Sequence, residues 1–343
     1  MTTPLLDIRS FNIVEDVVVG DRLHLIDLGV MKRLLLGWRD GTLGKRKWND
    51  SQYKQVTDAL RDAKLPTEIH RKLRSLMFVG QWKGSEFASF LHYASVVMLK
   101  DILATDLYKH FMLFFCATTL LSSSIYRDKW PLAGRFLDSF VEGFEQVYGK
   151  RYITSNVHNL QHIAHEVQRI GPLSTFSTYP FENKLQELKS SIRCGWKNLE
   201  QTIGRLSEYE NFDMPDIACI KYPFLVERGG TVTVHVQRGL MLQNTERNCW
   251  FLVKDNSIIQ FHNATNQLVE ATENVRIRGR RVSCVESLFS EPIDSSKLFM
   301  FKRYTDTLAE SYLEIKPDQI KCKLVALNTG SQRVRAFIPL IHT

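Results

Sequence analysis

The stretch from Tyr179 to Arg193 reads YPFENKLQELKSSIR and carries the clearest local signal in the chain. Pro180 favours a helix start, because its φ angle is already fixed near the helical value and the first helical N–H groups need no partner. An apolar stripe follows at helical spacing, formed by Phe181, Leu185, Leu188 and Ile192. The pattern predicts an amphipathic helix, whose plainest interpretation is a core helix with a solvated basic face.

A longer block around this helix resembles a known family. Residues 158–182 read HNLQHIAHEVQRIGPLSTFSTYPFE, and with the helix they are similar to the H…H…GP…YPFE…LK…R signature in the C-terminal half of CACTA-type (En/Spm) transposases. The resemblance implies that Glu182 is the last acid of a DDE catalytic triad. The other helix faces carry candidates for DNA contact, namely Lys184, Lys189 and Arg193.

A second match lies near the N-terminus, in FNIVEDVVVGDRLHLIDLGVMKRLLLGW (residues 11–38). The apolar run Val17–Val19 predicts a short buried strand, and Asp21 is placed to cap the helix that follows. That helix would use Leu25, Leu28, Leu35 and Trp38 as its apolar positions. Asp21 and His24 resemble the Asp-x-x-His motif around the second catalytic Asp of these transposases, and the alternative for Asp21 is a plain helix cap. His24 is then a structural partner of Asp21.

The resemblance implies phosphoryl transfer with two Mg²⁺ (or Mn²⁺) ions held by carboxylates of a DDE site. In that scheme Asp21 and Glu182 are both catalytic residues and metal ligands. The family's first Asp, however, precedes the second by well over a hundred residues, and only Asp7 and Asp16 precede Asp21 here. We therefore expect a chain that resembles a transposase without its N-terminal part, and that is not catalytic alone.

The chain divides into four parts by its pattern. The resemblance implies that residues 1–50 are a remnant of an RNase H-like core. Residues 51–170 have helical spacing throughout, including a predicted helix at 65–80 capped by Thr67 and one from Pro131 to Gly149. Core helices with YPFE fill 171–212, and a linker near 211–222 precedes a β-rich module at 221–343. The expected fold class is thus α/β plus β, with a partial RNase H-like core, a large helical insertion and a β-rich C-terminal module.

The composition favours a basic protein without a membrane span. The net charge is +8 and the pI is near 9.1, so the chain favours polyanions. A basic cluster between β-like segments contains Arg278, Arg280 and Arg281; it is either a DNA contact or a solvated turn. DNA binding by charge alone is expected to be weak, non-specific and salt-dependent.

Three histidines, His158, His162 and His165, share one predicted helix face. Such spacing can present two imidazoles, here His158 and His162, to one Zn²⁺. The sequence has no Cys-x-x-Cys to complete such a site. The favoured interpretation is that these histidines pack against the helical region or hydrogen bond across it, and zinc is the lesser one.

The sequence therefore predicts a transposon-derived, nuclear, DNA-associated protein that can form homo-oligomers. One alternative is a domesticated or decaying interaction module that binds proteins through its helices. Another is a partial gene model of an active transposase, whose third acid is encoded upstream.

Overall fold

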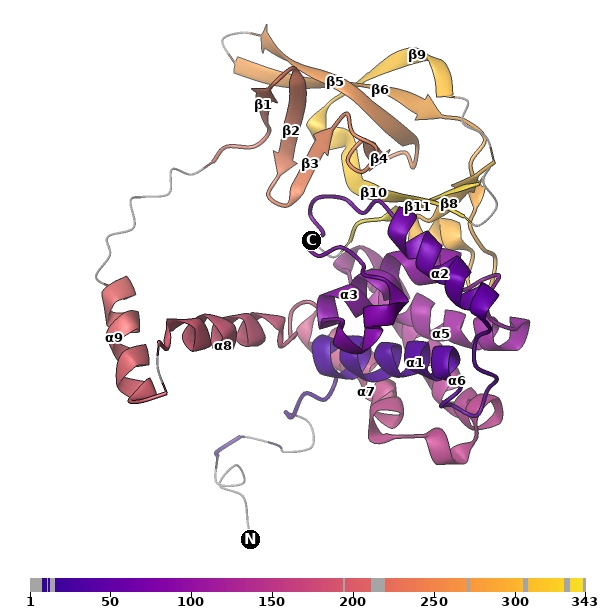
Figure 1. The fold of residues 1–343 in the computed structure, drawn as a ribbon. Helices are drawn as coiled ribbons and strands as arrows, with labels where there is room; N and C mark the ends of the chain where they lie inside the picture. The colour runs from indigo at the N-terminus through magenta and orange to yellow at the C-terminus, as the bar shows by residue number, and fades with distance from the viewer. Residues whose placement is uncertain are drawn as a thin grey trace.

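The helices come first along the chain and the strands second, in the computed structural model of the protein (Figure 1). The structure describes residues 8–10, 12, 16–193, 195–210, 220–269, 272–304, 308–329 and 334–341. The fold is of the α plus β class, since the strands form antiparallel sheets that follow a helical body. That much of the predicted fold class is confirmed.

The helical part begins with a π-helix, η2 (Arg22–Met31), which continues directly into α1 (Lys32–Asp40). The helices that follow are α2 (Asp50–Asp62), α3 (Gly84–Ser89), α4 (Ser95–Met98), α5 (Thr105–Leu121), α6 (Trp130–Tyr148), α7 (Ser155–Ile170), α8 (Tyr179–Ser191) and α9 (Asn198–Glu210). The predicted helix from Pro131 to Gly149 is confirmed as α6. Gly149 ends it at φ 100°, a conformation that favours glycine.

Two local predictions for the helical part are wrong. Val17–Val19 form no strand: Val17 is exposed, and the chain from Val17 to Asp21 is irregular. The segment 65–80 is not a helix apart from one 3₁₀ stretch at Leu76–Gln81, because its polar side chains are bound by distant residues. The described residues before Phe224 contain no β-strand, so the RNase H-like core stays a prediction.

The strands form a three-stranded sheet and an eight-stranded sheet, both antiparallel. The small sheet has the order β1 (Phe224–Arg228), β2 (Thr231–Gln237), β3 (Leu240–Gln243). The large sheet has the order β7 (Glu286–Ser287), β8 (Phe301–Arg303), β11 (Arg335–Pro339), β10 (Ile320–Asn328), β4 (Trp250–Val253), β5 (Ile258–Val269), β6 (Thr272–Val282), β9 (Leu308–Ile315). The predicted β-rich module is thus confirmed as a sheet structure. Its β4–β5 hairpin turns through Asn256 at φ 65°.

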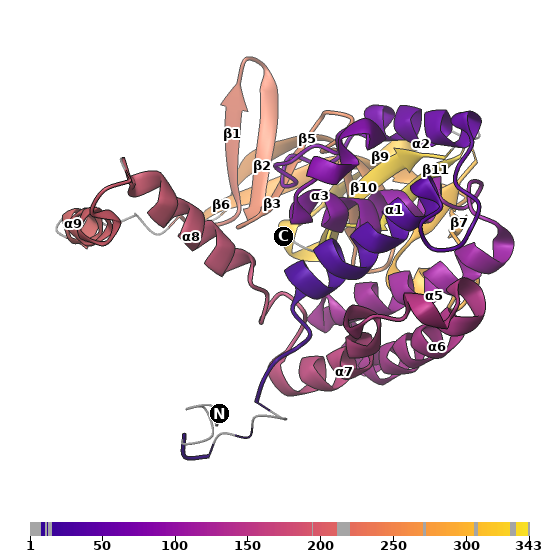
Figure 2. The same cartoon turned by 60° about the horizontal axis from the view of Figure 1, so that its bottom comes forward.

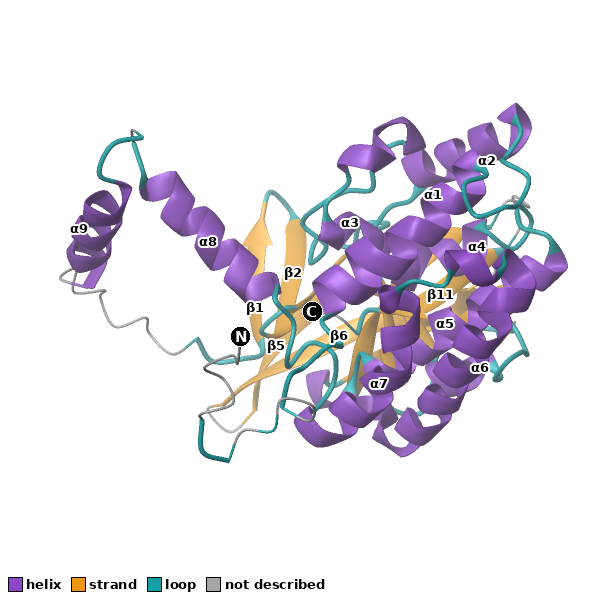
Figure 3. Ribbon diagram, turned by 90° about the horizontal axis from the view of Figure 1, so that it is seen from below, coloured by secondary structure: helices purple, strands orange, loops and turns teal. Residues whose placement is uncertain are grey.

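Two hydrophobic cores organise these elements. One joins the helices to one side of β10 and β11, where Val325 and Ile338 pack with the helical side chains. The other fills the space between the small sheet and β4, β5 and β6, around Phe251 and Phe261. The helices therefore lie against the sheet, as Figure 3 shows from below.

Helices α8 and α9 form an arm that projects from this body (Figures 1 and 2). The sequence predicted α8 correctly as a helix, with Pro180 in its first turn. The prediction of a core helix is wrong, because none of the residues of α8, all of which the structure describes, is buried. Most of the predicted linker lies outside the described residues.

Candidate functional site

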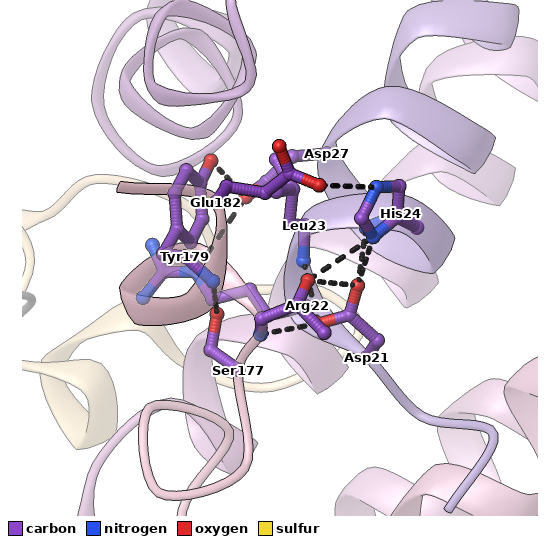
Figure 4. Close-up of polar contacts among 9 residues, drawn as sticks. Asp21, Arg22, Leu23, His24, Asp27, Ser177, Tyr179 and Glu182 are labelled. Carbon is purple, nitrogen blue, oxygen red and sulfur yellow. Dashed lines mark hydrogen bonds and ion pairs between the residues drawn. The ribbon is translucent and has the colours of Figure 1, made fainter. Parts of the chain in front are cut away.

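Asp21 joins the start of η2 to the start of α8 (Figure 4). Its Oδ1 accepts hydrogen bonds from the N–H groups of Leu23 (3.3 Å) and Thr178 (2.8 Å). Its Oδ2 accepts from the N–H of His24 (2.8 Å) and the hydroxyl of Thr178 (2.8 Å), and lies 2.7 Å from His24 Nδ1. Asp21 therefore caps the helix as the sequence predicted. It also holds Thr178 at the root of the arm, where α8 begins.

These donors decide the charge and the metal-binding capacity of Asp21. Burial acts to raise the pKa of this carboxyl, but the hydrogen bonds from Thr178 and His24 outweigh burial, so the pKa lies below its usual value. The ionised group is thus the stable form. Because protein donors occupy both oxygens, a Mg²⁺ ion would have to displace them, and the arrangement does not fit the ion as it stands.

His24 places its ring between the two predicted acids. Its Nδ1 contacts Asp21, and its Nε2 lies 3.8 Å from Glu182 Oε1 in the first turn of α8. Residues far apart in sequence therefore meet around one imidazole (Figure 4). The structural role predicted for His24 is confirmed, and Asp21 and Glu182 do share one neighbourhood.

A third acid, Asp27, lies deeper in the same place and was missed from the sequence. Its Oδ2 accepts a hydrogen bond from the Tyr179 hydroxyl (2.9 Å) and lies 3.6 Å from Arg22 Nε. Its Oδ1 has no hydrogen-bond partner among the described residues. Burial raises the pKa of Asp27 to about 7, although Arg22 and Tyr179 act in the other direction. A lone carboxylate in the apolar run Leu25–Leu28 was the available signal.

Glu166 on α7 fixes the chain just before Asp21. Its two carboxylate oxygens accept hydrogen bonds from the N–H groups of Val19 and Gly20, both at 2.7 Å. A side chain at position 20 would overlap Glu166 Oε2, so Glu166 would have to move away from these N–H groups. These bonds replace the sheet pairing that the Val17–Val19 run was predicted to make.

The arginines predicted to bind DNA lie on β6, but on opposite faces of the sheet. Successive strand residues alternate between faces, so Arg278 and Arg280 share one face and Arg281 lies on the other. Arg278 and Arg280 lie 4.3 and 4.5 Å from the centre of the Tyr312 ring on β9. Arg280 also donates to the Tyr312 hydroxyl (2.6 Å), and the ring of His262 packs edge-on against Tyr312. We call these four residues the Tyr312 cluster.

The remaining predicted DNA contacts lie on the arm. Lys184 forms an ion pair with Glu187 of the same helix, while Lys189 and Arg193 are exposed. They therefore belong to a different element from the Tyr312 cluster.

The predicted zinc ligands lie on the solvent side of α7. His158 and His162 have ring centres 5.5 Å apart, and both are exposed, as is His165. The packing role expected for these histidines is therefore wrong. Within the described ranges, no group of three or more His, Cys, Asp or Glu side chains is arranged to hold a metal ion.

Comparison with known proteins gives one match. A family model for a domain of unknown function (DUF8592) matches residues 231–340, which span β2 to β11. No curated protein and no solved structure matches the chain. In the part of the chain that the structure describes, no helix has the length and apolar content needed to cross a bilayer.

Proposed function

We propose that this protein associates with DNA through the Tyr312 cluster on the outer face of β5, β6 and β9. The observation that carries the proposal is the pairing of two guanidinium groups, Arg278 and Arg280, over one half-buried tyrosine ring. Stacking on Tyr312 holds both groups in place, so less side-chain freedom is lost when they bind an anion. Guanidinium groups suit phosphate because they donate two parallel hydrogen bonds.

The charge around the cluster supports the same function. Arg276 shares a face of β6 with Arg278 and Arg280, and the cross-strand neighbour of Arg278 is Glu314. Three arginines therefore lie on one face of β6, and a positive surface of this kind suits phosphate.

Duplex DNA binding tests this proposal. We expect binding to be independent of sequence and to weaken steeply with salt. Replacing Arg278 and Arg280 with alanine should reduce the slope of log K against log salt concentration by about 2, close to 1 for each lost phosphate contact. Fluorescence anisotropy over a salt series would measure this.

Arg281→Ala is the matched control, since it removes the same charge from the other face of the same strand. We expect its salt slope to stay near that of the unchanged protein. An equal fall in all variants would mean that net charge alone drives binding. A duplex that does not bind even at low salt would favour the protein-interaction alternative.

We further propose that the protein derives from a DDE transposase and acts in the nucleus without catalysis of its own. Support comes from the motifs Asp21-x-x-His24 and YPFE, which resemble that family in order and which meet around His24. In this proposal, η2 and α8 belong to the remnant of an RNase H-like core. Asp21 has kept a structural role there, because its oxygens bind the arm root in place of metal.

We expect the purified chain to show no Mg²⁺- or Mn²⁺-dependent nicking or strand transfer, because Asp21 is occupied by protein donors. The assay is cleavage of a transposon-end duplex by the unchanged protein beside Asp21→Ala and Glu182→Ala. Metal-dependent cleavage that either substitution abolishes would contradict the expectation and identify an active enzyme.

A further inference from the structure

The arm exposes more large apolar side chains than a solvated helix pair needs. Phe181 and Leu199 are each 70% exposed. On the two helices Leu185, Ile203 and Leu206 are exposed as well, and Trp196 is exposed in the turn between them. Soluble monomers rarely leave so many large apolar side chains exposed on neighbouring helices, so the arm indicates an interaction site.

The spacing of these side chains is that of helices that pack on other helices. In α8 the apolar positions Phe181, Leu185 and Leu188 are separated by four and three residues. In α9, Leu199, Ile203 and Leu206 repeat the four and three spacing. Alternating steps of three and four residues produce the seam of a left-handed helix bundle.

The arm is held away from the body by its root. The backbone N–H and hydroxyl of Thr178 bind Asp21, and the Tyr179 hydroxyl binds the buried Asp27. At the far end, the side chain of Gln201 accepts from the N–H of Arg193 and donates to the carbonyl of Trp196, which fixes the turn between the helices. The apolar stripes therefore stay available to another molecule.

The charges on the arm identify the kind of partner. Helix α8 carries two Lys and two Glu, and α9 carries three Glu and one Arg, whereas the whole chain has a net charge of +8. A surface without positive excess does not suit nucleic acid. Mixed signs suit a second identical arm, because a two-fold axis places Lys of one copy opposite Glu of the other.

The size of the surface also suits a second copy. Two arms that pack together would bury ten large exposed side chains of α8 and α9, five from each copy. Stable interfaces bury on the order of 1,200–2,000 Å² in total, with about 20–30 residues from each partner, and a helix pair that spans residues 179–210 is of that size.

We propose that the arm, residues 179–210, is the dimerisation surface for a second copy of this chain. The apolar stripes of α8 and α9 in one copy pack against those of the other copy. This inference stands independently of DNA association, since it rests on the arm and not on the Tyr312 cluster.

Sedimentation velocity of the full chain over a concentration series tests the proposal. We expect the unchanged protein to sediment as a dimer. The double variant Leu185→Glu/Ile203→Glu should dissociate at least about 100-fold more readily, since its carboxylates would be buried in an apolar seam. Both positions are exposed in the single chain, so the variant should fold, and an unchanged circular dichroism spectrum would verify this.

Met77→Glu is the matched control, because Met77 is 68% exposed and lies on the body. This variant should remain dimeric. A protein that is monomeric at every concentration would overturn the proposal and leave the arm to a different protein. A dimer that survives the arm substitutions would overturn it as well, by locating the interface elsewhere.

Discussion

Replacing Lys323 with methionine is expected to lower the free energy of unfolding by about 3–5 kcal/mol, because it removes one partner of a buried ion pair and leaves the other. The Lys323 ammonium group is 1% exposed and donates to both carboxylate oxygens of Glu68, at 2.8 and 2.7 Å. It also donates to Asn248 Oδ1 (2.9 Å). Without Lys323, the Glu68 carboxylate would remain buried with no cation. Urea unfolding followed by circular dichroism would measure the loss.

Two comparisons make this prediction specific. Glu68→Gln in the Lys323→Met background should restore most of the stability, since it removes the uncompensated charge and keeps an acceptor for the N–H of Met241. Lys64→Met breaks an exposed ion pair with Glu246, which joins the same two parts of the chain, and should cost less than about 1 kcal/mol. Equal losses for Lys323→Met and Lys64→Met would refute the assigned role of burial.

The Lys323 contact also explains why the helix predicted at residues 65–80 does not form. Local spacing there favours a helix, but Glu68 is bound by Lys323 of β10, and the N–H of Thr67 donates to Asn248. These partners lie about 180 to 255 residues further along the chain. No window of local sequence contains them, so helix propensity was overridden by contacts that only the fold reveals.

Other features could be predicted from the sequence because their causes are local. The cap at Asp21 and the Pro131–Gly149 helix each depend on residues within one or two turns of chain. The meeting of Asp21 with Glu182 was available only from the family resemblance. The separation of Arg281 from Arg278 and Arg280 follows from strand alternation, and it was missed because the cluster was also taken as a possible turn.

The exposed arm shows a different limit of sequence reasoning. Its stripe of Phe181, Leu185 and Leu188 is what a core helix would carry, and periodicity cannot tell a core from an interface between molecules. Asp27 shows the same limit for a charged residue, which is buried although its type suggests exposure. One carboxylate among apolar residues can face solvent or be buried, and only the position of Tyr179 shows that it is buried.

Asp27→Asn is expected to gain stability relative to the unchanged protein as the pH rises. The pKa of Asp27 is raised from 3.8 to about 7 in the folded protein, so between these values the unfolded chain releases the proton and the folded chain keeps it. Asp27 therefore stabilises the fold fully at low pH, and this contribution is lost as the pH rises to about 7. At 1.36 kcal/mol per pH unit, the variant should gain roughly 3 kcal/mol between about pH 5 and about pH 8.

The difference between the two proteins is the quantity to measure, by urea unfolding at each pH. Burial lowers the pKa of His92 and His110, so these groups make both proteins more stable as pH rises and cancel in the difference. Asp21→Asn is the control, because the pKa of Asp21 is shifted in the direction opposite to that of Asp27. The pKa of Asp21 is lowered, so this group is ionised in both states above about pH 5 and its difference from the unchanged protein should stay constant there. A constant difference for Asp27→Asn too would mean that Arg22 keeps Asp27 ionised throughout, and that the arm root is held by a buried ion pair.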